Sequence, residues 1–69
     1  MKTILINPAE IECCWEKNDA CFIKTKSGKV WVCNKFIYSY NMDTKSFISA
    51  FRNEAFIELP LQERGDNNG

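Results

Sequence analysis

Hydrophobic and polar residues alternate along much of this chain, in short stretches that turn residues separate. Alternation with a period of two residues is typical of a β-strand that buries one face, and β-branched residues favour the same structure. The pattern predicts strands over residues 3–6, 11–15, 20–26, 29–34 and 55–59. Residues 36–40 alternate as well and are predicted as a strand, with a short helical turn from Asn34 as the alternative.

The segment 11–15 is predicted to have one buried face. Its alternation places Ile11, Cys13 and Trp15 on one side of the strand. The opposite side carries Glu12, Cys14 and Glu16.

The strongest local signal is a β-hairpin that turns at Ser27-Gly28, between the predicted strands 20–26 and 29–34. A two-residue turn there places Thr25 opposite Val30 and Ile23 opposite Val32, which gives a clean aliphatic face. We favour this register because it groups aliphatic and small residues together. The other face then carries Phe22, Lys24, Trp31 and Cys33.

A second register of the same hairpin stays open. A three-residue loop with Gly28 in a left-handed bulge moves Trp31 to the face of Ile23, Cys21 and Cys33. A shift of one residue exchanges the two faces of a strand, so this choice decides which side chains are buried.

The spacing becomes helical after residue 42. Asp43 is a favourable N-cap, and Met42 and Phe47 are placed to form a hydrophobic staple around it. We therefore expect an α+β fold with a small antiparallel β-sheet of four to five strands and one short α-helix near the C-terminal end. The apolar face of that helix consists of Phe47, Ile48, Ala50 and Phe51.

The length limits the chain to one domain. A chain of 69 residues buries only about 60% of the surface that its unfolded form exposes, so self-association would add stability. We expect a single domain over residues 1–61 and a disordered polar tail over residues 62–69. We also expect a homodimer, or a domain that completes its interface on another protein. Because no signal peptide and no apolar run of about 20 residues is present, we expect a cytoplasmic protein without a membrane segment.

Nine basic and nine acidic residues cancel, which disfavours a dedicated nucleic-acid-binding domain.

The composition also argues against an enzyme. The chain has no histidine and no phosphate-binding loop or catalytic triad, so we expect no catalytic residue and no cofactor. Its cysteines, at positions 13, 14, 21 and 33, lack the spacing of a zinc site, and we expect buried, reduced thiols.

One candidate partner-binding surface remains, on the outer face and tip of the hairpin. Lysines interleaved with a tryptophan suit a protein interface, where tryptophan anchors are enriched, and also a nucleic-acid strand. The predicted contact residues are Trp31, Lys24, Lys26 and Lys29, with Phe22 and Tyr38 as secondary contacts.

These residues predict a small regulatory or inhibitory protein that covers the surface of a larger protein partner. A nucleic-acid-binding regulator that uses the same face is the first alternative. The second is a nucleotide-binding protein with sites at a dimer interface, lined by aromatic residues. Those residues are Trp15, Phe36, Tyr38 and Tyr40.

The segments INPAEIECCW and FIKTKSGKVWVCN resemble small flagellar-associated proteins of the FlbD type, in which a similar N-P/A-x-x-I-E segment precedes a Gly-Lys hairpin. The hairpin is also similar to that of LytTR DNA-binding domains. The FlbD pattern continues into a helix soon after the hairpin, whereas residues 36–40 intervene here. No residue role is carried over from either family. In size and character the chain also resembles small phage-encoded inhibitors such as anti-CRISPR proteins.

Overall fold

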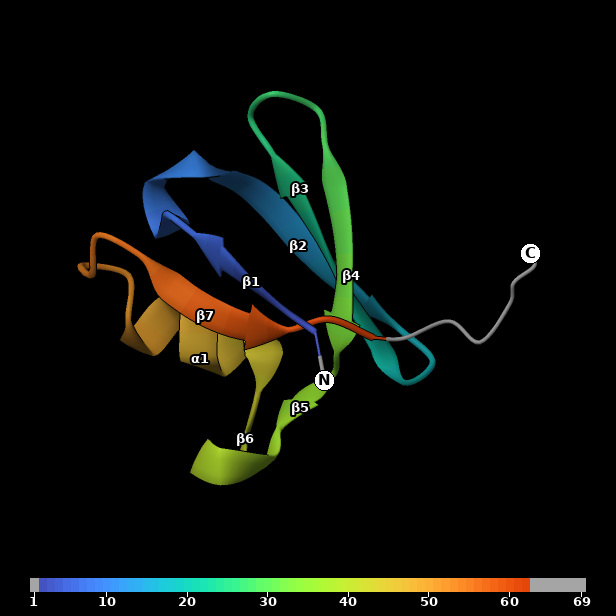
Figure 1. Ribbon diagram of the computed structural model, residues 1–69. Helices are drawn as coiled ribbons and strands as arrows, with labels where there is room; N and C mark the ends of the chain where they lie inside the picture. The colour runs from blue at the N-terminus through green and yellow to red at the C-terminus, as the bar shows by residue number, and fades with distance from the viewer. Residues whose placement is uncertain (1, 63–69) are drawn as a thin grey trace.

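The computed structural model describes residues 2–62, in which seven strands form three antiparallel sheets with one α-helix and two 3-10 helices (Figure 1). The predicted α+β class is confirmed. The predicted number of four to five strands is wrong, because residues 36–43 contain two additional two-residue strands. In chain order the elements are β1 (Thr3–Ile6), η1 (Pro8–Glu10), β2 (Ile11–Lys17), β3 (Ala20–Thr25), β4 (Val30–Asn34), β5 (Phe36–Ile37), η2 (Tyr38–Tyr40), β6 (Met42–Asp43), α1 (Thr44–Ala50) and β7 (Ile57–Pro60).

The two larger sheets are a three-stranded meander, in the order β2-β3-β4, and the pair β1-β7. Figure 1 shows β1 and β7 lying across one face of the meander, with α1 beside β7. Leu61 connects the two sheets. It forms an isolated antiparallel β-bridge with Cys33 of β4, and its N–H donates a hydrogen bond to the carbonyl of Lys2, just before β1. The next N–H, of Gln62, donates to Val32, and the rest of the predicted tail lies outside the described residues.

The core lies between the two sheets and α1. Ile23 of β3 and Leu59 of β7 are both fully buried there. Alternate residues of each strand point inward, which is the period that the sequence predicts for half-buried strands. The other buried members of the core are Ile6, Cys21, Cys33, Ile37, Phe47, Ile48 and Ile57.

The hairpin β3-β4 has the second of the two predicted registers, and the favoured one is wrong. Ile23 pairs with Trp31, and Lys24 pairs with Val30. A two-residue type I′ turn would need a positive φ at Ser27, which a serine adopts at a cost. The observed three-residue loop needs it only at Gly28, whose φ is 95°.

The hydroxyl of Thr25 closes this loop. It lies 2.9 Å from the hydroxyl of Ser27 and accepts a hydrogen bond from the N–H of Lys29 at 3.2 Å. The N–H of Gly28 also donates to the carbonyl of Thr25. These bonds fix the register in which β3 pairs with β4.

A β-bulge corrects the prediction for the first strand of the meander. The pairing of β2 with β3 shifts between Ile11 and Cys13, so Glu12 is the extra residue. Ile11 and Cys14 therefore both pack against the core, whereas Cys13 and Trp15 are exposed. The predicted buried face of Ile11, Cys13 and Trp15 does not form.

The predicted helix is confirmed with its cap. The carboxylate of Asp43 accepts a hydrogen bond from the N–H of Ser46 at 2.7 Å. The next residue, Thr44, is fully buried, and its hydroxyl donates to the carbonyls of Asn34 and Lys35. These bonds attach the start of α1 to the end of β4.

The strand predicted over residues 36–40 forms only at its first two residues, and the alternative helical turn from Asn34 is wrong, because Asn34 ends β4 and the helical turn begins at Tyr38. Two residues form β5, which pairs with β6, and the next three form η2. Asn41 returns the chain in the left-handed conformation, with φ of 52°.

Candidate protein-binding surface

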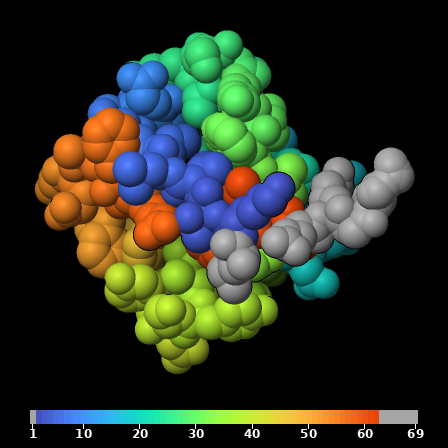
Figure 2. Space-filling view, in the orientation of Figure 1, coloured from blue at the N-terminus to red at the C-terminus, as the bar shows by residue number. Residues whose placement is uncertain are grey.

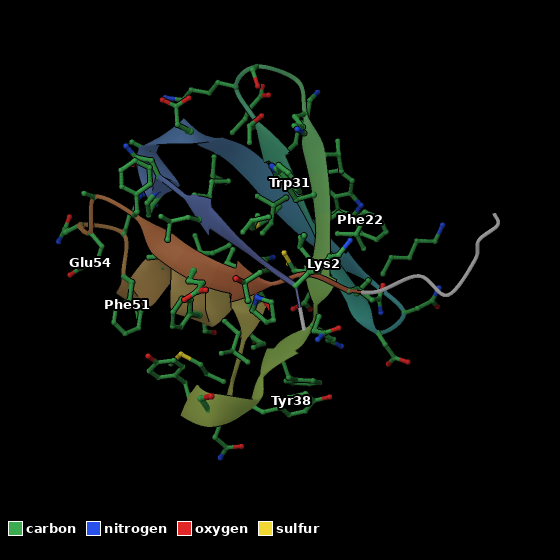
Figure 3. All side chains as sticks on the ribbon, in the orientation of Figure 1. Lys2, Phe22, Trp31, Tyr38, Phe51 and Glu54 are labelled. Atoms are coloured by element: carbon green, nitrogen blue, oxygen red, sulfur yellow. The ribbon has the colours of Figure 1, made fainter. Side chains whose placement is uncertain are left out.

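The six residues predicted to bind a partner do not form one surface. Phe22 and Lys24 lie on the face of the meander that points away from β1 and β7, because their neighbours Cys21 and Ile23 are buried in the core. Trp31 and Lys29 lie on the opposite side. Figure 3 shows Trp31 and Phe22 on opposite sides of the β4 ribbon. Lys26 is in the hairpin loop, and Tyr38 is in η2.

Trp31 packs against the core and is half-buried. The Nζ atom of Lys29 lies 4.4 Å from the centre of the indole ring, a cation–π contact on its remaining side. Trp31 and Lys29 thus contact each other within the subunit. Trp31 is consequently a residue that supports the hairpin, and its ring is only partly exposed, on the inner face rather than on the outer face that the favoured register would require.

The centre of the opposite face is a pair of stacked aromatic rings. Trp15 of β2 and Phe22 of β3 are directly opposite in register, with ring centres 5.5 Å apart and planes inclined by 6°. On the other side of Phe22, Val32 is its partner in β4. Trp15 is 41% exposed and Val30 is 45% exposed. We call this surface the outer sheet face and define it by Trp15, Phe22, Val30 and Val32.

Two lysines lie at the edge of the outer sheet face, and Asp19 lines a hollow there together with Lys17 and Phe22. Lys17 follows Trp15 by two residues in β2, and Lys24 follows Phe22 by two in β3, so all four share one side. The polar neighbour in β4 is Asn34. An apolar centre with lysines around it suits a partner with apolar and acidic groups.

The second exposed apolar region is the loop from Phe36 to Asn41, which we call the aromatic loop. Tyr38 is 80% exposed at its tip, and Phe36 is also exposed. The base is held by Ile37, which is buried, and by Tyr40, whose ring centre lies 5.0 Å from that of Phe47 with the two planes inclined by 50°. Figure 2 shows the yellow-green residues of this region as a lobe at the lower end of the molecule, opposite the hairpin tip.

The cysteines divide between the two faces of the meander. Cys21 and Cys33 are directly opposite each other in β3 and β4 and fully buried, whereas Cys13 is exposed. Burial raises the pKa of Cys21 to about 12 and the pKa of Cys33 to about 11. These two thiols are therefore structural. The predicted burial holds for this pair, is partial for Cys14, and fails for Cys13.

Sequence reasoning did not identify the outer sheet face as a unit. It named Phe22 and Lys24 correctly for that side, but assigned Trp15 to a buried face or a ligand pocket. The missing information was the bulge at Glu12, for which the sequence has no glycine or proline as a signal.

Comparison with known proteins finds no match for this chain among protein-family models, curated proteins or solved structures. Among the described residues, no helix has the length and apolar character needed to cross a membrane.

Proposed function

We propose that this protein is a non-enzymatic binding module that covers part of the surface of a larger protein partner through its outer sheet face. The observation that carries the proposal is the stacked Trp15–Phe22 pair at the centre of an apolar surface that stays partly open to solvent. Exposed contiguous apolar surface on a small domain marks an interaction site. Trp and Tyr are also the residues most enriched among those that dominate binding energy.

The outer sheet face is built on one continuous hydrogen-bonded sheet. Trp15, Phe22 and Val32 stand on three consecutive strands of one hydrogen-bonded sheet. The ring of Trp15 is further fixed by its stacking on Phe22. A surface that is ordered in the free protein loses little conformational entropy on binding, which favours affinity.

A second candidate function is binding of single-stranded nucleic acid, and it rests on Lys17 and Lys24 beside the aromatic pair. Aromatic rings stack on bases and lysines contact phosphates. Affinity would then fall steeply with salt, with a slope set by the number of phosphates contacted. The balanced charge of the chain and the mutual stacking of Trp15 and Phe22 favour the protein partner.

The test is capture of partners from lysate by the immobilised wild type and by two variants, each first shown to be folded by circular dichroism. Trp15→Ala removes the centre of the outer sheet face. Leu5→Ala removes a side chain that is 69% exposed on β1, in the other sheet, and serves as the matched control. We expect the same protein to be captured by wild type and Leu5→Ala, and lost with Trp15→Ala.

Two results would overturn the proposal. If Trp15→Ala captures the partner as well as Leu5→Ala does, the outer sheet face is not the binding surface. If capture disappears after nuclease treatment and weakens steeply between low and moderate salt, the nucleic-acid function replaces it.

A further inference from the structure

A groove runs between the start of β2 and one side of α1. Its volume is about 250 Å³, and Pro8, Ile11 and Ile48 form its apolar part. A second hollow of about 540 Å³ shares Pro8, Ile11, Glu12 and Arg52 with it and continues toward the hairpin loop. Because the two open hollows share these four residues, we treat them as one surface groove, which we call the seam groove. Its other residues are Cys13, Cys14, Lys45 and Ser49 on the first part and Ala9, Lys26 and Asn53 on the second.

The seam groove lies along the edge of β2. Consecutive residues of a strand point to opposite faces, yet Cys13 and Cys14 both line the groove. A hollow that touches both must face the strand from its side. Among the described residues β2 is paired only with β3, so this side is an edge with backbone groups available for hydrogen bonding.

The charged groups around the seam groove are mainly basic. Lys45 and Arg52 come from the α1 side, and Lys26 comes from the hairpin loop. Glu12, the extra residue of the bulge, is the acidic residue among those that line it. Burial raises the pKa of the Cys14 thiol at the groove, and the nearby ammonium group of Lys45 acts in the opposite direction.

We propose that an extended acidic peptide segment of a partner protein binds in the seam groove by adding a strand to the edge of β2. This inference goes beyond the function proposed above, because it assigns a second surface and does not depend on the outer sheet face. Strand addition to an exposed sheet edge gives affinity through main-chain hydrogen bonds and specificity through alternate side chains. Here the side chains that the added strand turns toward α1 meet Lys45, Ile48 and Arg52, and Pro8 and Ile11 line the start of the groove.

A peptide fits these features better than a nucleic acid does. Backbone N–H and C=O groups of a peptide match those of a strand edge, whereas a sugar–phosphate chain has no equivalent alternation of donors and acceptors. The lining residues include no aromatic ring on which bases would stack.

The experiment uses a fluorescein-labelled peptide that alternates Val and Asp, with blocked ends, and measures its binding by fluorescence anisotropy. Three control probes have the same length. The first replaces each Asp by Lys, the second carries N-methyl groups on alternate backbone nitrogens, and the third is oligothymidylate. We expect the Asp peptide to bind at least about tenfold more tightly than each control.

The variant Lys45→Glu/Arg52→Glu is expected to weaken binding of the Asp peptide at least about tenfold, and both side chains are exposed, so the fold is retained. Lys2→Glu/Lys17→Glu is the matched control, since it makes the same change in net charge with two exposed lysines that do not line the groove. Trp15→Ala should leave peptide binding unchanged, which separates this proposal from the proposed function. The exposed thiol of Cys13 maps the site, because bound peptide should slow its alkylation.

Each contrary result overturns the proposal. Equal binding of the N-methylated peptide removes strand addition, and equal binding of the Lys peptide removes the acidic ligand. Tighter binding of oligothymidylate assigns the groove to nucleic acid. If the protein alone forms a concentration-dependent dimer in which Cys13 is protected, the groove is occupied by a second copy.

Discussion

The two faces of the β2-β3-β4 meander are built from the same three strands and are almost equally apolar, but they differ in what covers them. The inner face buries Cys21, Ile23 and Cys33 completely under β1, β7 and α1. The outer sheet face presents Trp15 and Val30 with more than two fifths of each side chain exposed. Apolar composition alone therefore does not identify the core of a domain this small. The core face of the meander is the one that β1 and β7 cover.

The two tryptophans, one on each face of the meander, differ in the same way. Trp31 contacts the core and is capped by the ammonium group of Lys29, whereas Trp15 stacks on Phe22 at the outer surface. A shift of one residue in the hairpin would exchange Trp31 with Val30 and Val32. Whether the tryptophan of β4 lies on the core side or on the outer side thus depends on the register.

The largest expected effect is on the inner face. Ile23→Ala removes a fully buried side chain between the two sheets and should lower the free energy of unfolding by about 2–5 kcal/mol. Val30→Ala, on the outer sheet face, should lower it by less than about 1 kcal/mol. Chemical denaturation monitored by circular dichroism measures both. Equal losses would show that the outer sheet face is as buried as the inner one.

The buried thiols of the inner face and the exposed thiol of Cys13 should differ in reactivity. The pKa of Cys21 is raised to about 12 and that of Cys33 to about 11, from an ordinary value of 9.0, so both stay protonated at pH 8. In the native protein both should react with a thiol reagent at least about 100-fold more slowly than the exposed Cys13. Simultaneous reaction of all the thiols would contradict the burial of the pair.

These shifts also fix the direction of the alkaline pH dependence. The raised pKa means that the folded state holds protons that the unfolded state loses above pH 9. The stabilising contribution is therefore complete below pH 9 and decreases as the pH rises toward 11 and 12. The unfolding midpoint of the double variant Cys21→Val/Cys33→Val should fall less over this range.

Features of this fold that depend on neighbouring residues were predictable from the sequence. The strand β1, the location of the hairpin and the Asp43 cap of α1 each follow from residues within a few positions of one another. Turn and cap chemistry acts locally, so a single sequence contains the necessary information.

Features that depend on pairing between distant residues were not predictable in the same way. The bulge at Glu12 arises because Ile11 must face the core beside Thr25 while Cys14 must face it beside Ile23, and two residues separate them instead of one. The outer sheet face is a product of this bulge and of the hairpin register together. Two of the six predicted site residues, Phe22 and Lys24, lie on the outer side.

The hairpin register itself is testable at Gly28, because its φ of 95° belongs to a region that L-residues adopt at a cost. Gly28→Ala should lower the free energy of unfolding by about 1–2 kcal/mol, although no atom lies within 4 Å of the added methyl group. Gly28→Asn should cost less, since asparagine tolerates this conformation better. If Gly28→Ala is neutral, the loop does not require the bulge that places Trp31 inside.

The smallest expected effect is a difference in fluorescence between the two tryptophans, which tests the comparison directly. Trp15→Phe leaves Trp31 as the single emitter, and Trp31→Phe leaves Trp15. Because Trp31 contacts the core and Trp15 is 41% exposed, Trp31 should emit at the shorter wavelength and be quenched less by acrylamide. In urea the two spectra should become the same. A reversed order in the native protein would mean that the two faces of the meander are exchanged, and the proposed binding surface would then move to the side of Trp31. An equal order would mean that the two rings are equally exposed, which would remove the contrast between the two tryptophans.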